Sequence, residues 1–264
     1  MNFAQPYSNV VIKIGGSTLG SGDTTLEDLV SLQKEGIIPA VVHGGGKVIS
    51  QWMENSGIEP NFVRGLRVTD ERTLEVVVAV LGGLINKQLV AKLLLTGGKA
   101  IGLTGIDGAL FTASMMDPDL GAVGEITKVD VTPLSPILES KYIPVIAPIA
   151  LVNSDSKNCG FEFLNINGDT AAGALAATLG AEKLIFLTDV EGVLDSSGKV
   201  VQQLSSSEVE LMVREGTAAG GMIPKLEACL QSLPFVSETW IIDGRTPHAL
   251  INFLSGTGTG TRVG

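Results

Sequence analysis

Short apolar runs alternate with amphipathic stretches along almost the whole chain. The first run, residues 10–14, reads Val-Val-Ile-Lys-Ile, and two glycines and a serine follow it. A run of this length that ends in glycine is typical of a buried strand entering a tight loop. The pattern predicts further core strands at 37–42, 100–103, 143–146, 184–187, 239–242 and 260–263.

The stretches between the strands carry helical spacing and cap residues. The predicted helices run from 23 or 24 to 35, 47–56, 70–95, 132–141 and from about 168 to 179, and two more start after Ser205 and after the glycines at 220–221. We interpret Thr69 as the cap of the helix 70–95, and Ser205 with Glu208 as a capping box. For Asp169, taken alone, the residues favour an ordinary N-cap.

The predicted helix 70–95 differs from the others in its apolar content. Its apolar residues between 74 and 85 cover more than one face. Such a helix is buried on several sides, so we expect it to contribute to a subunit interface as well as to the core.

Strands that alternate with helices in this way predict an α/β fold. The expected sheet is mostly parallel and has helices on both faces. Two interruptions, at 62–68 and 109–131, are typical of β-hairpins, the second with a turn at 117–119. A boundary near residue 180 would leave a larger and a smaller lobe.

The amino-acid composition argues against some classes of binding partner. The chain has 264 residues and a net charge of −10, without a basic block, which argues against nucleic acid and anionic membranes. Cys159 and Cys229 match no metal spacing and are expected to be reduced thiols. The first residues lack the features of a signal peptide, and the apolar runs 76–85 and 142–153 are unsuited to spanning a bilayer. We therefore expect a cytoplasmic protein.

Standard nucleotide and metal motifs are missing. Gly46-Lys47 is followed by Val48 rather than Ser or Thr, and no GxGxxG opens a helix after a strand. His43 and His248 are isolated from each other and from the cysteines, so we expect no metal ligands in the protein.

What remains is a set of groups that bind anions. Glycine loops begin at Gly15, Gly44 and Gly220, and Lys13, Arg67 and Lys225 are cations beside loops. Helix N-termini and glycine amides bind phosphate or carboxylate. Two lysines and two such loops could hold a phosphoryl group during transfer. Each feature alone is also compatible with a tight turn or a surface cation.

Six segments, in order along nearly the whole chain, resemble the amino acid kinase family. They are Lys-Ile-Gly-Gly-Ser at 13–17, Val-His-Gly-Gly-Gly at 42–46, Gly-Leu-Arg-Val-Thr at 65–69, Asn-Ile-Asn-Gly-Asp-Thr-Ala-Ala at 165–172, Thr-Asp-Val-Glu-Gly-Val-Leu-Asp at 188–195 and Gly-Met-Ile-Pro-Lys at 221–225. Any one of these segments is weak evidence, whereas six in order are specific.

The resemblance implies a three-layer α/β/α sandwich around a mainly parallel sheet, in two lobes. Residues 1–180 would form an acyl-amino-acid-binding and dimerisation lobe, and residues 181–264 an ATP-binding lobe. The implied activity is transfer of the γ-phosphate of MgATP to the side-chain carboxylate of N-acetyl-L-glutamate, in arginine biosynthesis, with Mg²⁺ carried by the nucleotide. A carboxylate is already ionised at neutral pH, so no general base is needed.

The same resemblance assigns roles to residues. Lys13 and Lys225 would stabilise the transferring phosphoryl group, and Asp169 would orient both lysines. Gly16 and Gly45 would donate backbone N–H groups to phosphoryl oxygens. The implied substrate-binding residues are Gly44, Gly45, Arg67, which would hold the α-carboxylate, and Asn165. The implied nucleotide-binding residues, besides Gly16, are Asp189, Val190, Glu191, Gly192, Val193, Leu194, Thr217, Ala218 and Ala219.

The chain departs from the family pattern at two places, and two other functions stay open. Gly168 stands where the family usually has Ala. Only about nine residues precede the first strand, where arginine-inhibited hexameric members carry an extra helix, so we expect a homodimer that arginine does not inhibit. The alternatives are an aminoadipate kinase of lysine biosynthesis, with its substrate on an acidic carrier protein, and a non-catalytic metabolite sensor. The segment 65–69 and the negative charge favour a free substrate.

Overall fold

The computed structural model of the chain describes residues 9–15, 23–153, 160–195, 197–216 and 221–264. Gly16, Cys159, Gly220 and the segments 1–8 and 217–219, on which expectations were placed, lie outside the described residues.

The first half of the chain forms these elements: β1 (Val10–Ile14), α1 (Thr25–Lys34), β2 (Ala40–His43), α2 (Gly46–Asn55), β3 (Phe62–Val63), β4 (Leu66–Arg67), α3 (Glu71–Val78), η1 (Ala79–Ile85), α4 (Asn86–Leu95), β5 (Ala100–Thr104), η2 (Asp107–Ala109), β6 (Phe111–Met115), η3 (Pro118–Leu120), β7 (Val123–Val129), η4 (Thr132–Leu134) and α5 (Ser135–Glu139). The second half forms β8 (Ile143–Ala147), β9 (Ile149–Val152), β10 (Phe163–Ile166), α6 (Gly168–Leu179), β11 (Lys183–Thr188), β12 (Gln203–Leu204), α7 (Ser206–Glu215), α8 (Met222–Ser232), β13 (Glu238–Asp243), α9 (Ala249–Leu254) and β14 (Thr261–Val263).

The main sheet has eight strands in the order β12-β14-β13-β11-β1-β2-β8-β5. Neighbouring strands from β13 through β11, β1, β2 and β8 to β5 are parallel. Only the β13–β14 pair is antiparallel, and β12 runs parallel to β14. The expectation of a mostly parallel sheet is confirmed.

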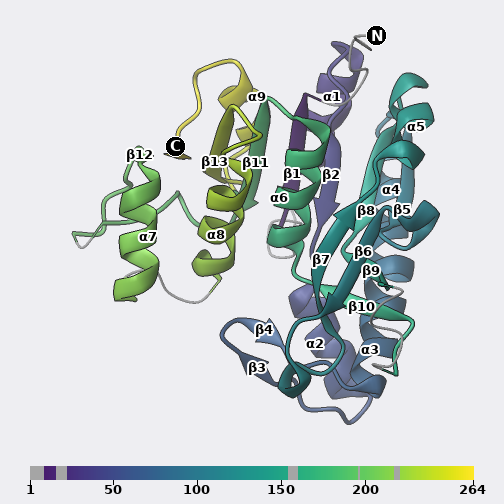
Figure 1. Cartoon of the computed structure of the whole chain (residues 1–264). Helices are drawn as coiled ribbons and strands as arrows, with labels where there is room; N and C mark the ends of the chain where they lie inside the picture. Colours follow the sequence, from purple (N-terminus) through teal and green to yellow (C-terminus); the bar gives the residue numbers. More distant parts are fainter. Residues whose placement is uncertain (1–8, 16–22, 154–159, 196, 217–220) are drawn as a thin grey trace, which may run out of the picture.

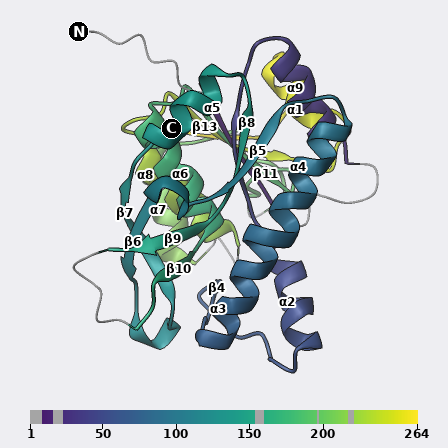
Figure 2. The same cartoon turned by 90° about the vertical axis from the view of Figure 1, so that its right-hand side faces the viewer.

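Both faces of the sheet are buried under helices. In β1, Val10, Ile12 and Ile14 join one apolar core, whereas Val11 points to the other. The first core contains residues of α1, α2, the helix 71–95 and α9, and the second contains residues of α6, α7 and α8. Figure 2 shows these two groups of helices on opposite sides of the sheet. The fold is therefore the expected three-layer α/β/α sandwich.

A second, smaller group of strands lies beside the sheet, on the side of α6. It joins β10, β7, β6 and β9, and a separate two-stranded hairpin joins β3 and β4 (Figure 1). The hairpins expected at 62–68 and 109–131 are confirmed. The strands β9, β10 and β12 and the helix α9 were not expected. Pro148 separates β8 from β9 within one apolar run, which the sequence pattern alone does not divide.

The predicted helix 70–95 is present as α3, a π-helical segment η1 and α4 in direct succession. Its cap is Asp70, whose Oδ1 accepts a hydrogen bond of 2.8 Å from the Thr73 amide, so the assignment of Thr69 as the cap was wrong. By length and composition residues 71–95 could span a bilayer, although a core helix of a soluble protein satisfies the same criterion. The expected capping box of Ser205 and Glu208 is confirmed on α7.

Candidate active site

Lys13 lies on β1, near the carboxyl end of a central strand. It alternates with Ile12 and Ile14, so its side chain shares the face of Val11 and points toward α6. The residue is only 7% exposed. Its Nζ lies 2.7 Å from Asp169 Oδ1, an ion pair without the angles of a hydrogen bond. A buried ammonium needs such a partner, because burying an isolated charge is costly.

Asp169 is directed at this lysine by the cap of α6. The cap is Asn167, whose Oδ1 accepts hydrogen bonds from the amides of Asp169 (2.8 Å) and Thr170 (3.2 Å). Asp169 itself does not cap the helix, so that interpretation was wrong. Because Asn167 satisfies the helix N-terminus, the Asp169 carboxylate remains available to cations.

Lys225 is the second cation at Asp169. It comes from the first turn of α8, where its Nζ lies 3.3 Å from Asp169 Oδ2 and donates to the Gly221 carbonyl at 3.0 Å. Residues 13, 169 and 225, from three separate elements, thus share one carboxylate between two ammonium groups. The structure brings together the three residues expected to act in catalysis.

The protonation of this cluster follows from burial and charge. Burial raises the pKa of Asp169, but the charges of Lys13 and Lys225 outweigh it, so this pKa lies below its ordinary value. Burial lowers the pKa of Lys225, and the charge of Asp169 opposes that effect. With Asp169 ionised, two ammonium groups and one carboxylate leave an excess positive charge, which suits an anionic ligand.

The glycine loop after β2 lies beside β1. The Gly44 amide donates to the Ile14 carbonyl at 3.0 Å, which holds the loop next to the end of the strand that carries Lys13. Gly45 is the cap residue of α2. The amides that follow belong to the helix N-terminus and have no intrahelical acceptors, an arrangement that attracts anions.

Arg67 lies on β4, beside α2. Its guanidinium donates to Gly46 O (2.9 Å) and Ser50 Oγ (2.8 Å), contacts Met53 Sδ at 3.1 Å and lies 4.6 Å from the centre of the Phe62 ring. It is 7% exposed, and burial lowers its pKa. Among the described residues no carboxylate forms an ion pair with it. A buried guanidinium of this kind can receive a ligand carboxylate.

Asn165 is connected to Arg67 through Thr69. Asn165 Nδ2 donates to Thr69 Oγ1 at 3.1 Å, and that hydroxyl donates to the Arg67 carbonyl at 2.7 Å. Thr69 is fully buried. Sequence analysis assigned Arg67 and Asn165 but not the connecting role of Thr69, whose only signal was its place at the end of the segment 65–69.

A cavity of about 430 Å³ lies beside the lysine–aspartate cluster. Residues 167 and 170, which flank Asp169, line it together with Pro224, which precedes Lys225. Its apolar walls include Leu66, Met116 and Val123. Sequence analysis missed these apolar residues, because nothing in their local pattern distinguishes them from core positions.

The segment 189–194 follows β11, at the same edge of the sheet as the end of β1. The Gly15 amide donates to the Leu187 carbonyl at 3.2 Å, which ties the two strand ends together. Gly192 has φ +150°, and a β-carbon there would lie 2.6 Å from Thr261 Oγ1, so the turn requires glycine. Within the segment Gly192 and Val193 are buried, whereas Asp189, Val190, Glu191 and Leu194 are exposed.

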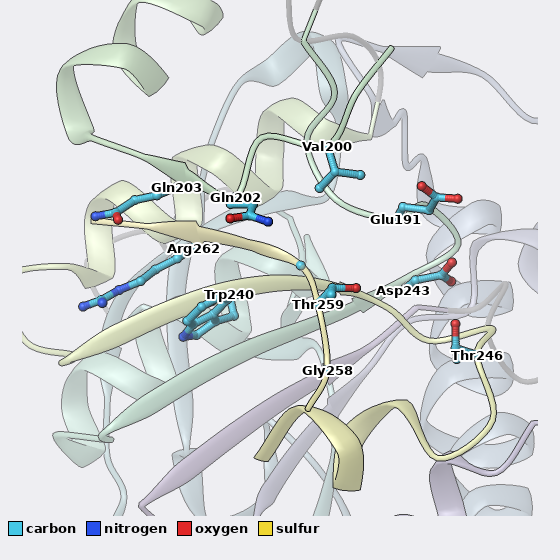
Figure 3. Close-up of a pocket in the computed structure, with 11 residues that line it drawn as sticks. Glu191, Val200, Gln202, Gln203, Trp240, Asp243, Thr246, Gly258, Thr259 and Arg262 are labelled. Carbon is cyan, nitrogen blue, oxygen red and sulfur yellow. The ribbon is translucent and has the colours of Figure 1, made fainter. Parts of the chain in front are cut away.

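A larger cavity, of about 790 Å³, lies elsewhere, around β13 and β14 (Figure 3). Trp240 and Arg262 line it on the face of the sheet opposite to α8, and Glu191 and Asp243 lie at its other end. Neither lysine of the cluster lines it, nor do Asp169 and Arg67. Size alone therefore does not identify the active site of this chain.

Comparison with known proteins identifies the family of the chain. The sequence pattern of the amino acid kinase family matches residues 9–234. An acetylglutamate kinase of Dehalococcoides mccartyi is 41% identical over 264 residues, which cover 100% of this chain and 97% of that protein. One from Cereibacter sphaeroides is 45% identical, covering 99% and 90% of the two chains. The crystal structure of smu.665 from Streptococcus mutans UA159 superposes with a TM-score of 0.81 at 30% identity, covering 96% and 97%. The chain belongs to the amino acid kinase family.

Proposed function

We propose that this amino acid kinase transfers the γ-phosphate of MgATP to the side-chain carboxylate of N-acetyl-L-glutamate, acting as an acetylglutamate kinase in arginine biosynthesis. The observation that carries the proposal is the pair of lysines on Asp169, the buried Lys13 and the half-buried Lys225, at a sheet edge that also presents a glycine loop. Relatives of that name, 41% and 45% identical over at least 99% of this chain, support it.

The reaction needs positioning and charge stabilisation rather than a base. A carboxylate oxygen of the acyl amino acid attacks the γ-phosphorus, the bond from that phosphorus to the β-phosphate oxygen breaks, and ADP leaves. The products are N-acetyl-L-glutamyl 5-phosphate and ADP, and no proton has to be removed, because the attacking carboxylate is ionised at neutral pH. Mg²⁺ bound to the nucleotide supplies further positive charge to the phosphates.

The cluster suits the phosphoryl group in this reaction. Lys13 on β1 and Lys225 on α8 both contact Asp169 and would stabilise the charge on the phosphoryl oxygens. Asp169 keeps the two ammonium groups from moving apart. The amides of Gly16 and Gly45 would donate to the same oxygens, Gly16 from outside the described residues.

The acyl amino acid is proposed to lie between Arg67 and the cluster. Arg67, which has no carboxylate partner among the described residues, would bind the α-carboxylate in bidentate fashion. Gly44, Gly45 and Asn165 would hold the rest of the molecule. The apolar wall of Leu66, Met116 and Val123 suits a small apolar group such as acetyl.

ATP is proposed to bind on the other side of the cluster. The segment 189–194, on the C-terminal lobe 181–264, would line the nucleotide pocket together with 217–219, which lie outside the described residues. The N-terminal lobe 1–180 would bind the acyl amino acid. Burial lowers the pKa of Lys225, and the charge of Asp189 is a minor effect in the opposite direction, consistent with a location of this segment close to Lys225.

We also propose that the chain is a homodimer, built around the helix 71–95. Only 39% of its most apolar 18-residue window is buried within one chain, and Leu94 and Leu95 are 49% and 88% exposed. In a dimer with two-fold symmetry, each copy would cover the exposed apolar surface of the other copy's helix 71–95. Light scattering at micromolar concentration should give twice the mass of the 27.4 kDa chain, and Ala79→Arg on the exposed face should give monomers. A monomeric or hexameric wild type would contradict the dimer.

We also propose a cytoplasmic location, in keeping with the proposed biosynthetic function. The net charge of −10 and the free, buried thiol of Cys229 support it. The proposed partners are therefore N-acetyl-L-glutamate, MgATP and a second copy of the chain.

A hydroxamate assay for acyl phosphate tests the function. N-acetylglutamate, glutamate, aspartate and N-acetyl-aminoadipate are compared side by side with MgATP. We expect product with N-acetylglutamate in clear excess over the other three. A preference for N-acetyl-aminoadipate would support an aminoadipate kinase instead, and no product with any substrate would support a metabolite sensor.

A further inference from the structure

Two buried polar side chains beneath the glycine loop take no part in the chemistry described above. His43 is the last residue of β2, Asn86 is the first residue of α4, and both are 0% exposed. His43 Nε2 lies 3.2 Å from Asn86 Nδ2, and His43 Nδ1 lies 3.2 Å from the Gly44 carbonyl oxygen. The imidazole therefore connects the substrate loop to the helix 71–95.

The partners of His43 fix its tautomer. Burial lowers the pKa of His43 to about 4, the hydrogen bond to Gly44 opposes this, and the charges of Lys13 and Lys87 add to it. At neutral pH the ring is neutral and has one N–H donor and one acceptor. Since the Gly44 carbonyl can only accept, Nδ1 carries the proton and Nε2 accepts from the Asn86 amide.

Asn86 is itself held by two strands. Its Nδ2 lies 2.9 Å from the Val145 carbonyl on β8 and 3.1 Å from the Leu103 carbonyl on β5, so these two oxygens and His43 Nε2 share its two N–H hydrogens. Lys87 Nζ donates to Asn86 Oδ1 at 3.1 Å. A β-carbon at Gly102 would collide with that oxygen, so glycine at 102 makes the space for the amide. These contacts hold the Asn86 side chain in one position in the core.

The same helix contacts the loop a second time. A β-carbon at Gly45 would lie 2.8 Å from Leu81 Cδ2, and Ile85 Cδ1 lies closer still. Leu81 and Ile85 belong to the π-helical segment η1, which ends one residue before Asn86. π-helical turns occur frequently at functional sites, and this one presents Leu81, Ile85 and Asn86 to the loop together.

We propose that Asn86 is a positioning residue for the acyl substrate, acting through His43 on the orientation of the Gly44 and Gly45 peptide groups. Because Asn86 is fully buried, it would act without contacting substrate or nucleotide. Its loss leaves Nε2 of a fully buried histidine without a donor and lets the loop turn about β2. This inference rests on the proposed function, because the loop is taken to bind N-acetylglutamate.

The first test compares Asn86→Ala with Thr239→Val. Thr239 is also 0% exposed, and its hydroxyl donates to Val263 O at 2.8 Å in the C-terminal lobe, so its replacement costs a buried hydrogen bond away from the loop. Asn86→Ala should raise KM for N-acetylglutamate on the order of tenfold, with KM for ATP changed by less than about twofold. Thr239→Val should lower Tm and leave both KM values unchanged. Equal effects of the two variants would overturn the proposal.

A double-mutant cycle tests the route through His43. If Asn86 acts through His43, then His43→Gln with Asn86→Ala should raise KM no further than the larger single effect. Additive effects would show that Asn86 acts independently and would overturn the proposal. Asn86→Asp, which keeps the shape but removes the donor N–H, replaces Asn86→Ala if that variant does not fold.

Amide hydrogen exchange separates this proposal from the proposed function. Failure of the wild type to phosphorylate N-acetylglutamate would refute the function, while exchange at residues 44–46 still reports on the loop. Asn86→Ala should speed exchange there about tenfold, and Thr239→Val should not. Unchanged exchange at 44–46 in Asn86→Ala would overturn the positioning role whatever the substrate.

Discussion

Gly173 on α6 faces Ala228 on α8 so closely that a β-carbon at 173 would lie 3.1 Å from the Ala228 carbonyl oxygen and 3.3 Å from its Cβ. Asp169 lies one turn before Gly173, and Lys225 lies three residues before Ala228. The spacing of the two helices therefore sets the 3.3 Å distance between Lys225 Nζ and Asp169 Oδ2.

Gly173→Val should push α8 away from α6 and separate Lys225 from Asp169. We expect kcat to fall at least about tenfold, because a displacement near 1 Å is costly in catalysis. Overpacking should also lower the stability by about 1–3 kcal/mol. Kinetics and urea unfolding measure both effects, with Thr178→Val on the exposed part of α6 as the control. An unchanged kcat would mean that the helix spacing does not position Lys225.

Lys13→Ala and Lys225→Ala should each lower kcat on the order of 10²-fold or more, with much smaller changes in KM. Interactions that strengthen in the transition state behave in this way. Steady-state kinetics measure the effect. Lys183→Ala is the matched control, since Lys183 also pairs with a carboxylate, that of Glu238, but at the amino end of β11. Near-normal kcat in either variant would remove that lysine from the mechanism.

Arg67→Lys should raise KM for N-acetylglutamate and leave KM for ATP nearly unchanged. A guanidinium can hold a carboxylate with two parallel hydrogen bonds, whereas an ammonium cannot. We expect KM to increase on the order of tenfold, which corresponds to a loss of about 1.4 kcal/mol of binding free energy. The exposed Arg72→Lys serves as the control. An unchanged KM for the acyl substrate would reopen the carrier-protein alternative.

Gly168→Ala should stabilise the protein with little effect on catalysis. Alanine is favoured over glycine in a helix by about 0.5–1 kcal/mol. The new β-carbon would lie 3.3 Å from Lys13 Cε, and a flexible lysine stem can move by the few tenths of an ångström required. Chemical denaturation should show the gain, and kcat should stay within about threefold. A large loss of kcat would show that Lys13 needs the space left by glycine.

The contact between His248 and Asp28 should make stability depend on pH. His248 Nδ1 lies 2.8 Å from Asp28 Oδ1, and this hydrogen bond, followed by the carboxylate charge, raises the pKa of His248 above 6.5. The folded state therefore binds the proton more tightly than the unfolded state. The contribution is fully present below pH 6.5 and is lost as the pH rises through the raised pKa.

Urea unfolding of the wild type and His248→Gln between pH 5.5 and about 9 measures this contribution. The wild-type advantage in midpoint should shrink toward alkaline pH. Because the His248 side chain is 53% exposed, we expect a small change that salt screens further. A constant difference across the range would exclude the ion pair as its source.

The main strands and helices could be predicted from the sequence, because buried positions recur along each of them at a regular spacing. The run 10–14 is buried throughout, as expected of a central parallel strand. The caps were less certain, since Thr, Asp and Asn are all good N-cap residues. Asp70 and Asn167 are the caps, while Thr69 and Asp169 point into the site. Which of two nearby residues caps the helix depends on the side chains that each one contacts in the fold. Those contacts come from residues distant in sequence.

The site was predictable where the resemblance assigned a residue and unpredictable where only the fold brings residues together. Lys13, Asp169 and Lys225 meet as expected. The pair of His43 and Asn86 was missed, because 43 residues separate them and each directly follows the end of an apolar run. The available signal was a polar residue at the end of each apolar run, and burying either side chain without a hydrogen-bond partner would be costly.

The position of β1 has a consequence for how the chain acquires its shape during synthesis. This strand lies between β2, made soon after it, and β11, in which Lys183 pairs with Val10. Until the ribosome has delivered residues 183–188, β1 has one open edge, and open edges promote aggregation. A fragment that stops at residue 180 should therefore aggregate rather than bind the acyl amino acid alone. Each proposed lobe would then depend on the other for folding, even though each is proposed to bind a different ligand.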